Sequence, residues 1–387
     1  MRKRTRPIDW RTIAIVLLVL LCVALYDAAV QPVAEAPGAP AEPTPLSVPV
    51  VSSPMVPTPS GTLDMYMTTS ALVYPDIPAQ RSAPALYTAF LADIDAATTR
   101  IDIAVFDIDL PELGAALVRA AKRGVAVRVA YDDENLTDAR VAKLIGALQD
   151  ARITVRSDQR EPFMHQKTAV IDGTIVWTGS WNMTMNDTYR NNNNMVRMVS
   201  PQLALGYTAE ADQLMAGFFG VHKTSTAPYP IIQIGARSVW YAFSPVDGIN
   251  QQIVTLLDAA TTQITFMAFS YTDPAIANAM IRAHKRGVAV HGVMEKQNTR
   301  GTGSVFEKLQ RAKVDIIADG NCYIMHHKTI IIDDNTVVTG SYNFTKSAEK
   351  SNDENLIVLT DPDAVRTYLT EYALVRATAD APPACDS

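Results

Sequence analysis

The chain is short of positive charge, and this shortage limits the partners that it can bind. Its 387 residues hold 34 Lys and Arg against 40 Asp and Glu, which gives a net charge of −6. Five of the bases but only two of the acids lie in residues 1–30, so the rest of the chain is more acidic still. Proteins that bind duplex nucleic acid tightly present a broad cationic surface. The composition disfavours such a protein and leaves room only for a local basic groove.

Long apolar runs are also scarce. A single run, Ile13–Leu25, follows a basic start and precedes Asp27-Ala-Ala. Its length suits the core of a signal peptide and is short for a membrane-spanning helix. We expect residues 1–30 to be a signal peptide, cleaved after Ala28 or Ala29, or else an uncleaved signal anchor. In both cases we expect an extracytoplasmic body that is secreted or anchored to the membrane by this N-terminal segment.

Cysteine is rare, and only Cys322 and Cys385 lie beyond the N-terminal segment. Outside the cytoplasm they can form a disulfide that ties the tail to the chain just before residue 326, or they can remain free thiols. Proline, in contrast, is concentrated in one place, because nine of the 23 prolines lie in residues 31–60. With no apolar periodicity there, we predict a semi-extended Pro-rich linker over residues 31–79.

From residue 80 onward, helical and buried-strand patterns alternate and then repeat. Even the helix ends agree, with Lys122-Arg-Gly-Val-Ala-Val in one half and Lys285-Arg-Gly-Val-Ala-Val in the other. This predicts an α/β protein, a tandem pair of homologous α/β/α sandwich lobes related by a pseudo-two-fold axis. The expected parts are lobe 1 at 80–222, a connector at 223–245, lobe 2 at 246–378 and a tail at 379–387. The expected helices are 84–97, 111–123, 138–151, 253–260, 273–286 and 305–312.

Histidine is scarce as well, yet two of the six histidines occupy identical frames, one in each half of the chain. The frames are His165-x-Lys167-x4-Asp172-x6-Gly179-Ser180-x-Asn182 and His326-x-Lys328-x4-Asp333-x6-Gly340-Ser341-x-Asn343. Alternate residues of a strand share a face, so each His points the same way as its Lys. Two such pairs predict one site, across the pseudo-two-fold axis, with two imidazoles and two ammonium groups. Such a site suits a phosphodiester.

The chemistry of a phosphodiester assigns roles to these residues. It requires cations and donors on the non-bridging oxygens, a nucleophile, and an acid for the leaving oxygen. Neutral imidazole can attack and imidazolium can act as the acid near neutral pH. The predicted catalytic residues are His165, Lys167, His326 and Lys328. The predicted phosphate ligands are Lys167, Lys328, Asn182, Asn343, Ser180 and Ser341, with the two serines equally able to stabilise the turn instead.

The doubled motif resembles the phospholipase D superfamily over roughly residues 80–375. The second copy and the stretch that follows it, Gly340–Asn355, resemble the small bacterial endonuclease branch of that family. The resemblance implies hydrolysis or transfer at a phosphodiester through a covalent phosphohistidine, with no metal and no other cofactor. Because both motifs lie in one chain, a monomer is expected to suffice for activity.

Glu354 and Asn193 follow their respective histidines at the same spacing, near the place where the family has a carboxylate that orients the imidazole. We therefore expect Glu354 beside His326, which favours imidazolium and the role of acid, and Asn193 beside His165, the nucleophile. A carboxylate can instead hold a nucleophilic His in its reactive tautomer, and Asp187 could replace the acid that lobe 1 lacks. We expect supporting, structural roles for the remaining group: Asp172 and Asp333, which cap tight turns, and His327, on the opposite strand face.

Three functions are compatible with this pattern. The first choice is hydrolysis or transfer of phospholipid head groups at a membrane surface, because the body is acidic and is expected outside the cytoplasm. The alternative is a metal-independent endonuclease that cleaves DNA or RNA. The third is a non-catalytic surface module that retains the fold, which the two intact motifs disfavour. The Arg300-Gly-Thr-Gly303 segment lacks the context of a phosphate-binding loop, so we interpret it as a flexible connection.

Overall fold

The computed structural model describes residues 61–227 and 229–385. The predicted signal segment and residues 31–60 of the predicted linker lie outside these ranges. Among the described residues, no helix combines the length and the apolar character that a bilayer crossing needs.

Lobe 1 is built on a seven-stranded sheet in the order β1-β7-β6-β5-β2-β3-β4. Strands β2, β3 and β4 run parallel, and the others join in antiparallel pairs. Parallel neighbours need a crossover, which α3 (Pro111–Lys122) and α4 (Ala139–Asp150) supply. The strands are β1 (Leu63–Met67), β2 (Arg100–Val105), β3 (Ala126–Tyr131), β4 (Thr154–Ser157), β5 (Lys167–Ile171), β6 (Ile175–Gly179) and β7 (Asn194–Val199).

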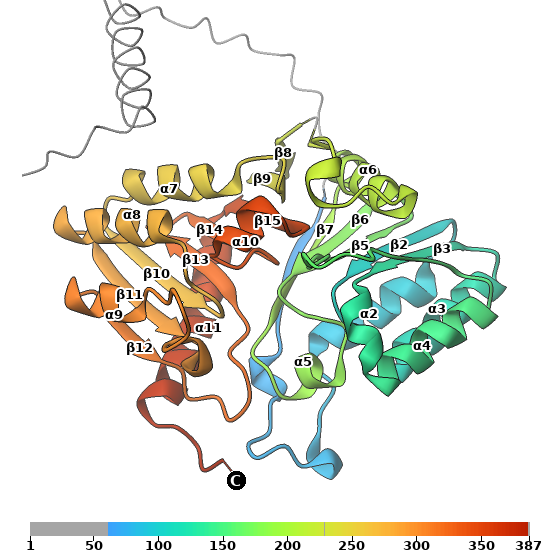
Figure 1. Ribbon diagram of the computed structural model, residues 1–387, viewed down its shortest axis with the longest axis horizontal. Helices are drawn as coiled ribbons and strands as arrows, with labels where there is room; N and C mark the ends of the chain where they lie inside the picture. The colour runs from blue at the N-terminus through green and yellow to red at the C-terminus, as the bar shows by residue number, and fades with distance from the viewer. Residues whose placement is uncertain (1–60, 228, 386–387) are drawn as a thin grey trace, which may run out of the picture. The chain divides into compact units, whose positions relative to one another are not determined.

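Lobe 2 repeats this plan in an eight-stranded sheet, ordered β12-β11-β10-β13-β14-β15-β9-β8. Its parallel strands are again connected by helices, α8 (Pro274–Lys285) and α9 (Phe306–Arg311). The predicted tandem α/β fold is therefore confirmed, as Figure 1 shows. The strands are β8 (Ile231–Ile234), β9 (Arg237–Ser244), β10 (Gln263–Ala268), β11 (Ala289–Met294), β12 (Asp315–Ala318), β13 (Lys328–Ile332), β14 (Thr336–Gly340) and β15 (Glu354–Thr360).

Helices cover both faces of each sheet. Alternate residues of β2 separate the faces: Ile103 packs in the core under α2 (Ala85–Ala96), α3 and α4, whereas Ala104 packs with Leu214 of α6 (Pro201–Ala216). In lobe 2, Met267 of β10 packs with Val375 of α11 (Pro362–Asp380), opposite the core under α7 (Ile249–Ala259) and α8. This alternation produces the predicted α/β/α layers (Figure 1).

The two inner layers share one hydrophobic core. It joins α6 and strands of the first sheet to α11 and strands of the second, so neither half buries its inner face alone. Sequence reasoning did not identify α6 or α11, although Leu203, Tyr207, Ala211 and Leu214 repeat at helical spacing and are all buried. The core between the lobes contains, among others, Val176, Met198, Tyr207, Tyr241, Ile357 and Tyr368.

Two predicted boundaries are wrong, for the same physical reason. The linker does not extend to residue 79, because β1 pairs with β7 along its whole length. The connector at 223–245 is not a plain connection either, because β9 pairs with β15 and β8 with β9. Both β7 and β15 would otherwise present unpaired backbone groups, and the flanking segments satisfy them.

The structure joins Cys322 to Cys385, with the Cα atoms 5.2 Å apart, which answers the question that the sequence left open. The bond ties the end of the chain to the loop before His326. The same loop reaches lobe 1, because the Asn321 amide donates to the carbonyl of Arg190 and to the side chain of Asn192.

We predict that the double variant Cys322→Ala/Cys385→Ala is less stable than the native protein by about 2–4 kcal/mol. The bond closes a loop with a sequence separation of 63 residues, which restricts the unfolded chain. Guanidinium titration of the free energy of unfolding measures this difference. Equal midpoints and slopes for the two proteins would contradict the prediction.

Candidate active site

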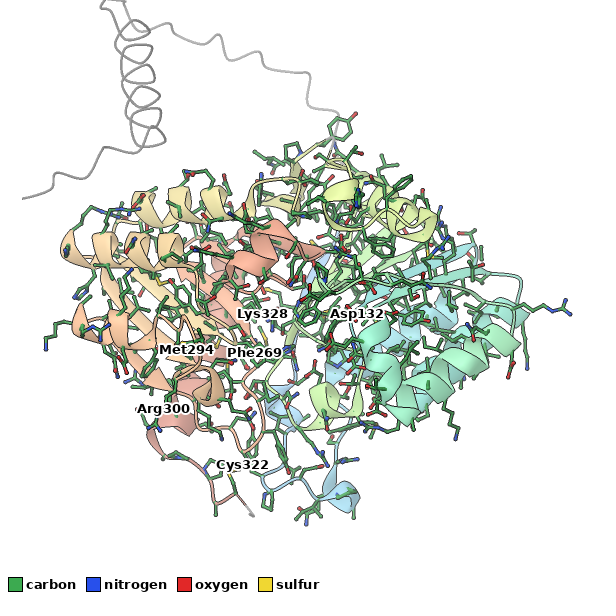
Figure 2. All side chains as sticks on the ribbon, viewed as in Figure 1. Asp132, Phe269, Met294, Arg300, Cys322 and Lys328 are labelled. Atoms are coloured by element: carbon green, nitrogen blue, oxygen red, sulfur yellow. A yellow bond between two sulfur atoms is a disulfide. The ribbon has the colours of Figure 1, made fainter. Side chains whose placement is uncertain are left out.

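The two His–Lys pairs lie at the starts of equivalent strands, β5 and β13, and all four side chains are almost completely buried. Each ammonium group donates to the backbone carbonyl of its own histidine at 2.8 Å, Lys167 to His165 and Lys328 to His326. The common direction of each pair agrees with a phenylalanine ring that lies near both side chains, Phe106 in lobe 1 and Phe269 in lobe 2. Figure 2 shows Lys328 and Phe269 in the centre of the molecule, where lobe 2 faces lobe 1.

Backbone hydrogen bonds connect the two motifs across the lobes. The N–H of His165 donates to the carbonyl of Asp353 at 2.9 Å, and the N–H of His326 donates to the carbonyl of Asn192 at 2.9 Å. Each histidine therefore lies beside the segment that begins the last strand of the other lobe. The four residues form one site across the pseudo-two-fold axis, as the repeat predicts.

Each imidazole contacts an orienting residue that belongs to the opposite lobe. Nδ1 of His165 lies 2.8 Å from Oε2 of Glu354, and Nδ1 of His326 lies 2.9 Å from Oδ1 of Asn193. The predicted pairs, Glu354 with His326 and Asn193 with His165, are therefore wrong. Spacing along one motif copy places the orienting residue correctly on its strand, but it does not reveal which imidazole that strand faces.

Asp187 supplies the second carboxylate. Its Oδ2 lies 3.4 Å from Nδ1 of His326, and it accepts hydrogen bonds from the backbone of Asn182 and the amide of Asn191. It therefore replaces the missing acid of lobe 1, as considered from the sequence, but at His326. Because His165 has a carboxylate partner and His326 also has one nearby, the expectation that a neutral partner marks the nucleophile no longer applies.

The two motif serines hold the orienting residues. Ser180 donates to Oδ1 of Asn193 at 2.9 Å, and Ser341 donates to Oε2 of Glu354 at 2.7 Å. Each hydroxyl thus donates its single proton to an orienting residue of its own lobe, and the two roles expected from the sequence, a phosphate ligand or a turn-stabilising residue, stay predictions. The side-chain oxygens of Asn182 and Asn343 are buried and have no hydrogen-bond partner among the described residues.

Asp172 and Asp333 are structural, as predicted, but they do not cap their own turns. Asp172 accepts hydrogen bonds from the backbone N–H groups and the hydroxyls of the segment before β2, and Asp333 does the same before β10. Each carboxylate thus fastens the end of the motif strand to the preceding helix–strand loop. His327 is also structural, because its ring contacts Asn194 and Glu371 on the other face of β13.

Sequence reasoning missed two aromatic walls of the site. The ammonium nitrogen of Lys167 lies 5.0 Å from the ring centroid of Phe106, and that of Lys328 lies 4.6 Å from that of Phe269. The same rings flank His165 and His326 at centroid distances of 5.0 and 4.7 Å. A cation over an aromatic face is stabilised without an anion, so these walls hold the ammonium groups in place. Both phenylalanines follow the first strand of their repeat, which was a usable signal.

Burial controls the electrostatics of the site. It lowers the pKa of Lys167 to about 8, and burial together with the charge of Lys167 lowers the pKa of Lys328 well below its ordinary value. Burial also lowers the pKa of both histidines, that of His326 to about 3, and raises the pKa of Glu354 to about 8. A bound anion would stabilise the charged lysines, so the site favours a phosphate.

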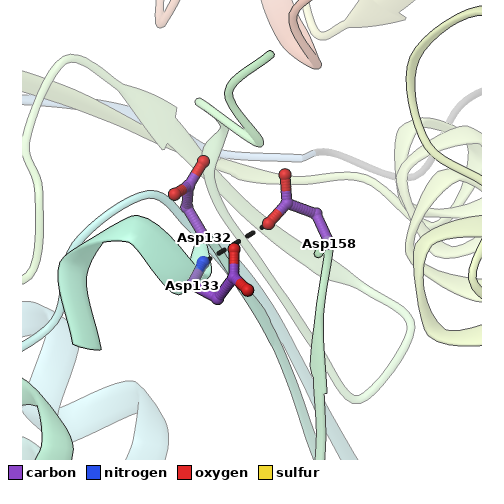
Figure 3. A group of neighbouring side chains, drawn as sticks. All are labelled: Asp132, Asp133 and Asp158. Atoms are coloured by element: carbon purple, nitrogen blue, oxygen red, sulfur yellow. Dashed lines mark hydrogen bonds between the residues drawn. The ribbon is translucent and has the colours of Figure 1, made fainter. Parts of the chain in front are cut away.

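An acidic cluster behind His165 could in principle hold a metal ion. Figure 3 shows its members, Asp132, Asp133 and Asp158, whose carboxylates approach one another within 4.8 Å. However, Asp132 accepts the N–H of Met164, and Glu295 accepts the N–H of Met325 at the equivalent place in lobe 2. The counterpart of Asp133 in lobe 2 is Lys296. The shared feature is an acid that anchors the segment before each histidine, so we assign the cluster to support.

Two α/β lobes that each contribute a His–Lys pair to one buried site define a protein of the phospholipase D-like fold. The family model described as "Cardiolipin synthase, PLD-like domain" matches residues 90–215 and 253–374, more than half of the chain. The chain therefore belongs to the phospholipase D superfamily, and the resemblance noted in its sequence is confirmed.

Individual relatives agree with this assignment. A phospholipase D of Rickettsia typhi is 33% identical over 189 residues, which cover 47% of this chain and 93% of that protein. A mitochondrial cardiolipin hydrolase of Xenopus tropicalis is 30% identical over 33% of this chain and 60% of its own length. The phosphatidylserine synthase of Haemophilus influenzae, at 13% identity and a TM-score of 0.59, shares the fold over 81% of this chain and 86% of its own.

The crossed pairing predicts which histidine responds to each substitution. We expect Glu354→Gln to change the ring ¹⁵N resonances of His165 and to leave those of His326 in place. We expect Asn193→Asp to raise the pKa of His326, because a carboxylate stabilises imidazolium. NMR titration of the ring nitrogens measures both effects. If Glu354→Gln changed the resonances of His326 but not those of His165, Glu354 would lie beside His326, and the crossed pairing would be contradicted.

The pKa shifts also predict a loss of activity in alkali. Lys167 loses its charge with a pKa of about 8, which weakens phosphate binding above that value. Burial lowers the pKa of His326 to about 3, so a rising pH also depletes the imidazolium that is expected to serve as the acid. We therefore expect kcat/KM to fall as the pH rises above about 8. A plateau that persists through the alkaline range would contradict this.

Proposed function

We propose that this protein hydrolyses phospholipid head groups, or transfers them to an alcohol, through a covalent phosphohistidine. One observation carries the proposal: the two His–Lys pairs are buried where the lobes meet, and each imidazole is held by a residue of the other lobe. Two cations and two imidazoles supply the charge stabilisation, nucleophile and acid that a phosphodiester requires.

We assign the attack to His165. A nucleophilic imidazole needs its Nδ1–H held by an acceptor so that Nε2 presents a lone pair, and the Glu354 carboxylate at 2.8 Å is suited to that. His326 has an amide oxygen at 2.9 Å and a carboxylate at the longer distance of 3.4 Å. The partner of His165 is thus a carboxylate and not the neutral Asn193 expected from the sequence, and it supports the same nucleophile.

The reaction then has two displacements. Nε2 of His165 attacks phosphorus, and the bond from phosphorus to the leaving oxygen breaks. The imidazolium of His326, which the bound phosphate anion and Asp187 stabilise against the effect of burial, donates its proton to that oxygen. Water, or an alcohol, next attacks the phosphohistidine while His326 accepts its proton, and the bond from phosphorus to nitrogen breaks. Lys167 and Lys328 neutralise the non-bridging oxygens, and the amides of Asn182 and Asn343 complete the set of donors.

Exposed apolar side chains near the site favour a lipid over a nucleic acid. Phe163, 36% exposed, lies with its ring centroid 6.3 Å from that of His165. Phe218 and Val221, 52% and 68% exposed, flank Gly220, whose N–H donates to Asp353 beside Glu354. Apolar groups at the rim of a site suit an acyl or membrane surface. We further propose that residues 1–30 direct the protein out of the cytoplasm and toward that membrane.

We predict that Lys328→Ala lowers kcat/KM by about 10²–10³-fold, because it removes a cation from the transition state. The matched control is His291→Gln, which alters an exposed His–Asp pair far from the motifs in sequence and should keep full activity. The substrates are phosphatidylcholine and phosphatidylglycerol vesicles, with single-stranded DNA in parallel and no added metal. Strand cleavage without lipid turnover would favour the nuclease, and silence on all three would favour a non-catalytic module.

Trapping the intermediate tests the assignment of the nucleophile. We expect acid-labile label from a lipid labelled at phosphorus to map to His165, because the head group departs and the phosphatidyl group stays on the enzyme. With a substrate whose leaving group needs no proton, His326→Asn should accumulate that label, because formation of the intermediate then proceeds without the acid and its hydrolysis lacks the base. Label on His326 alone would reverse the roles of the two histidines.

A further inference from the structure

A groove in lobe 2 takes no part in the chemistry described above. It has a volume of about 520 Å³ and lies between the 302–305 loop, α9 and α10 (Lys346–Lys350). Its lining contains three cations and no carboxylate. The polar lining residues used below are Thr302, Ser304, Lys308, Arg311 and Lys346. The segment that the sequence suggests to be a plain connection therefore forms one wall of a basic groove.

The groove is close to the active site along two segments of the chain. Lys346 follows the motif residue Asn343 by three positions, and the lining residue Thr272 follows the aromatic wall Phe269 by three. Three residues span at most about 10 Å. Ser347 lines both this groove and a second cavity of about 200 Å³ whose lining includes Phe163, the neighbour of His165. The groove and the cavity beside Phe163 therefore share a wall at Ser347, close to the active site along the chain.

Lobe 1 has no equivalent of these charges. In the register that aligns the two His–Lys motifs, the counterparts of Lys308, Arg311 and Lys346 are Ala147, Asp150 and Met185. The catalytic residues are almost symmetric, so they give little reason for a substrate to bind in one orientation rather than the reverse. Three cations on one side only provide that reason.

The cations are available to a ligand. Arg311 contacts Glu307 at 3.1 Å, but both side chains are more than 70% exposed, and such a pair contributes little. Within residues 61–227 and 229–385, Lys308 and Lys346 form no ion pair. Their charge, together with the hydroxyls of Thr302 and Ser304, suits the oxygens of a phosphate group.

We propose that this groove binds a second phosphate of the substrate, an inference that rests on the proposed function. The preferred substrate is then a phospholipid whose head group carries two phosphates, with one at the histidines and the other in lobe 2. The apolar rim formed by Phe163, Phe218 and Val221 favours this lipid over a polynucleotide, which also carries successive phosphates. The groove therefore selects one of the two orientations in which a substrate could bind to a nearly two-fold symmetric site.

The test compares cardiolipin, which has two phosphates on one glycerol, with phosphatidylglycerol, which has one. Both are presented in vesicles of equal surface charge to the native protein and to Lys308→Gln/Arg311→Gln/Lys346→Gln. The matched control, Lys122→Gln/Lys143→Gln/Arg152→Gln, removes three cations from lobe 1. Thermal unfolding verifies that both triple variants are folded.

We expect the groove variant to raise KM for cardiolipin roughly tenfold, with kcat preserved and KM for phosphatidylglycerol changed less than about twofold. The control variant should show the same relative change in KM for the two lipids. An equal rise in KM for both lipids, or no rise for either, would overturn the proposal for the groove. Turnover of phosphatidylglycerol by the native protein would in that case still support the proposed phospholipase activity. Loss of single-stranded DNA cleavage alone would assign the groove to nucleic acid. Absence of lipid turnover in the native protein would overturn both proposals.

Discussion

The site depends on a pair of hydrogen bonds that cross between the lobes. Glu354 of lobe 2 holds the imidazole of His165, and Asn193 of lobe 1 holds that of His326. The serines of the two motifs hold these partners in turn. Neither half can orient its own histidine, so the active geometry exists only when the lobes are docked. The shared core of α6, α11 and the inner sheet faces stabilises that docking.

Docking has an electrostatic cost that explains the preference for an anion. Two lysines, two histidines and two carboxylates are removed from water in one site. Burial disfavours the charged form of each group, so each charge that persists must be stabilised by its partners. The phenylalanines over the lysines and the backbone carbonyls of the histidines offset part of this cost. A phosphodiester anion would offset more, so binding energy and catalytic charge come from the same groups.

The sequence predicted the parts of the site and mistook their pairing. Constant spacing identified His165, Lys167 and their counterparts because a motif within one strand and turn is a local pattern. It could not show that the start of β15 faces His165, because that contact depends on how two lobes pack. The same limit hid β1, β8 and β9, whose place in the sheets is decided by distant edge strands. The helix α6 is different, since its apolar spacing was visible and was overlooked.

The central claim is that one phosphorus atom occupies a single site between both imidazoles. A crystal structure of the protein with orthovanadate, which takes the geometry of a phosphoryl group in transfer, tests it most directly. The account predicts one vanadium per chain, bonded to one imidazole and within hydrogen-bond reach of the other, with both ammonium groups on its oxygens. Two vanadium atoms per chain, each bound by the residues of one lobe only, would contradict it.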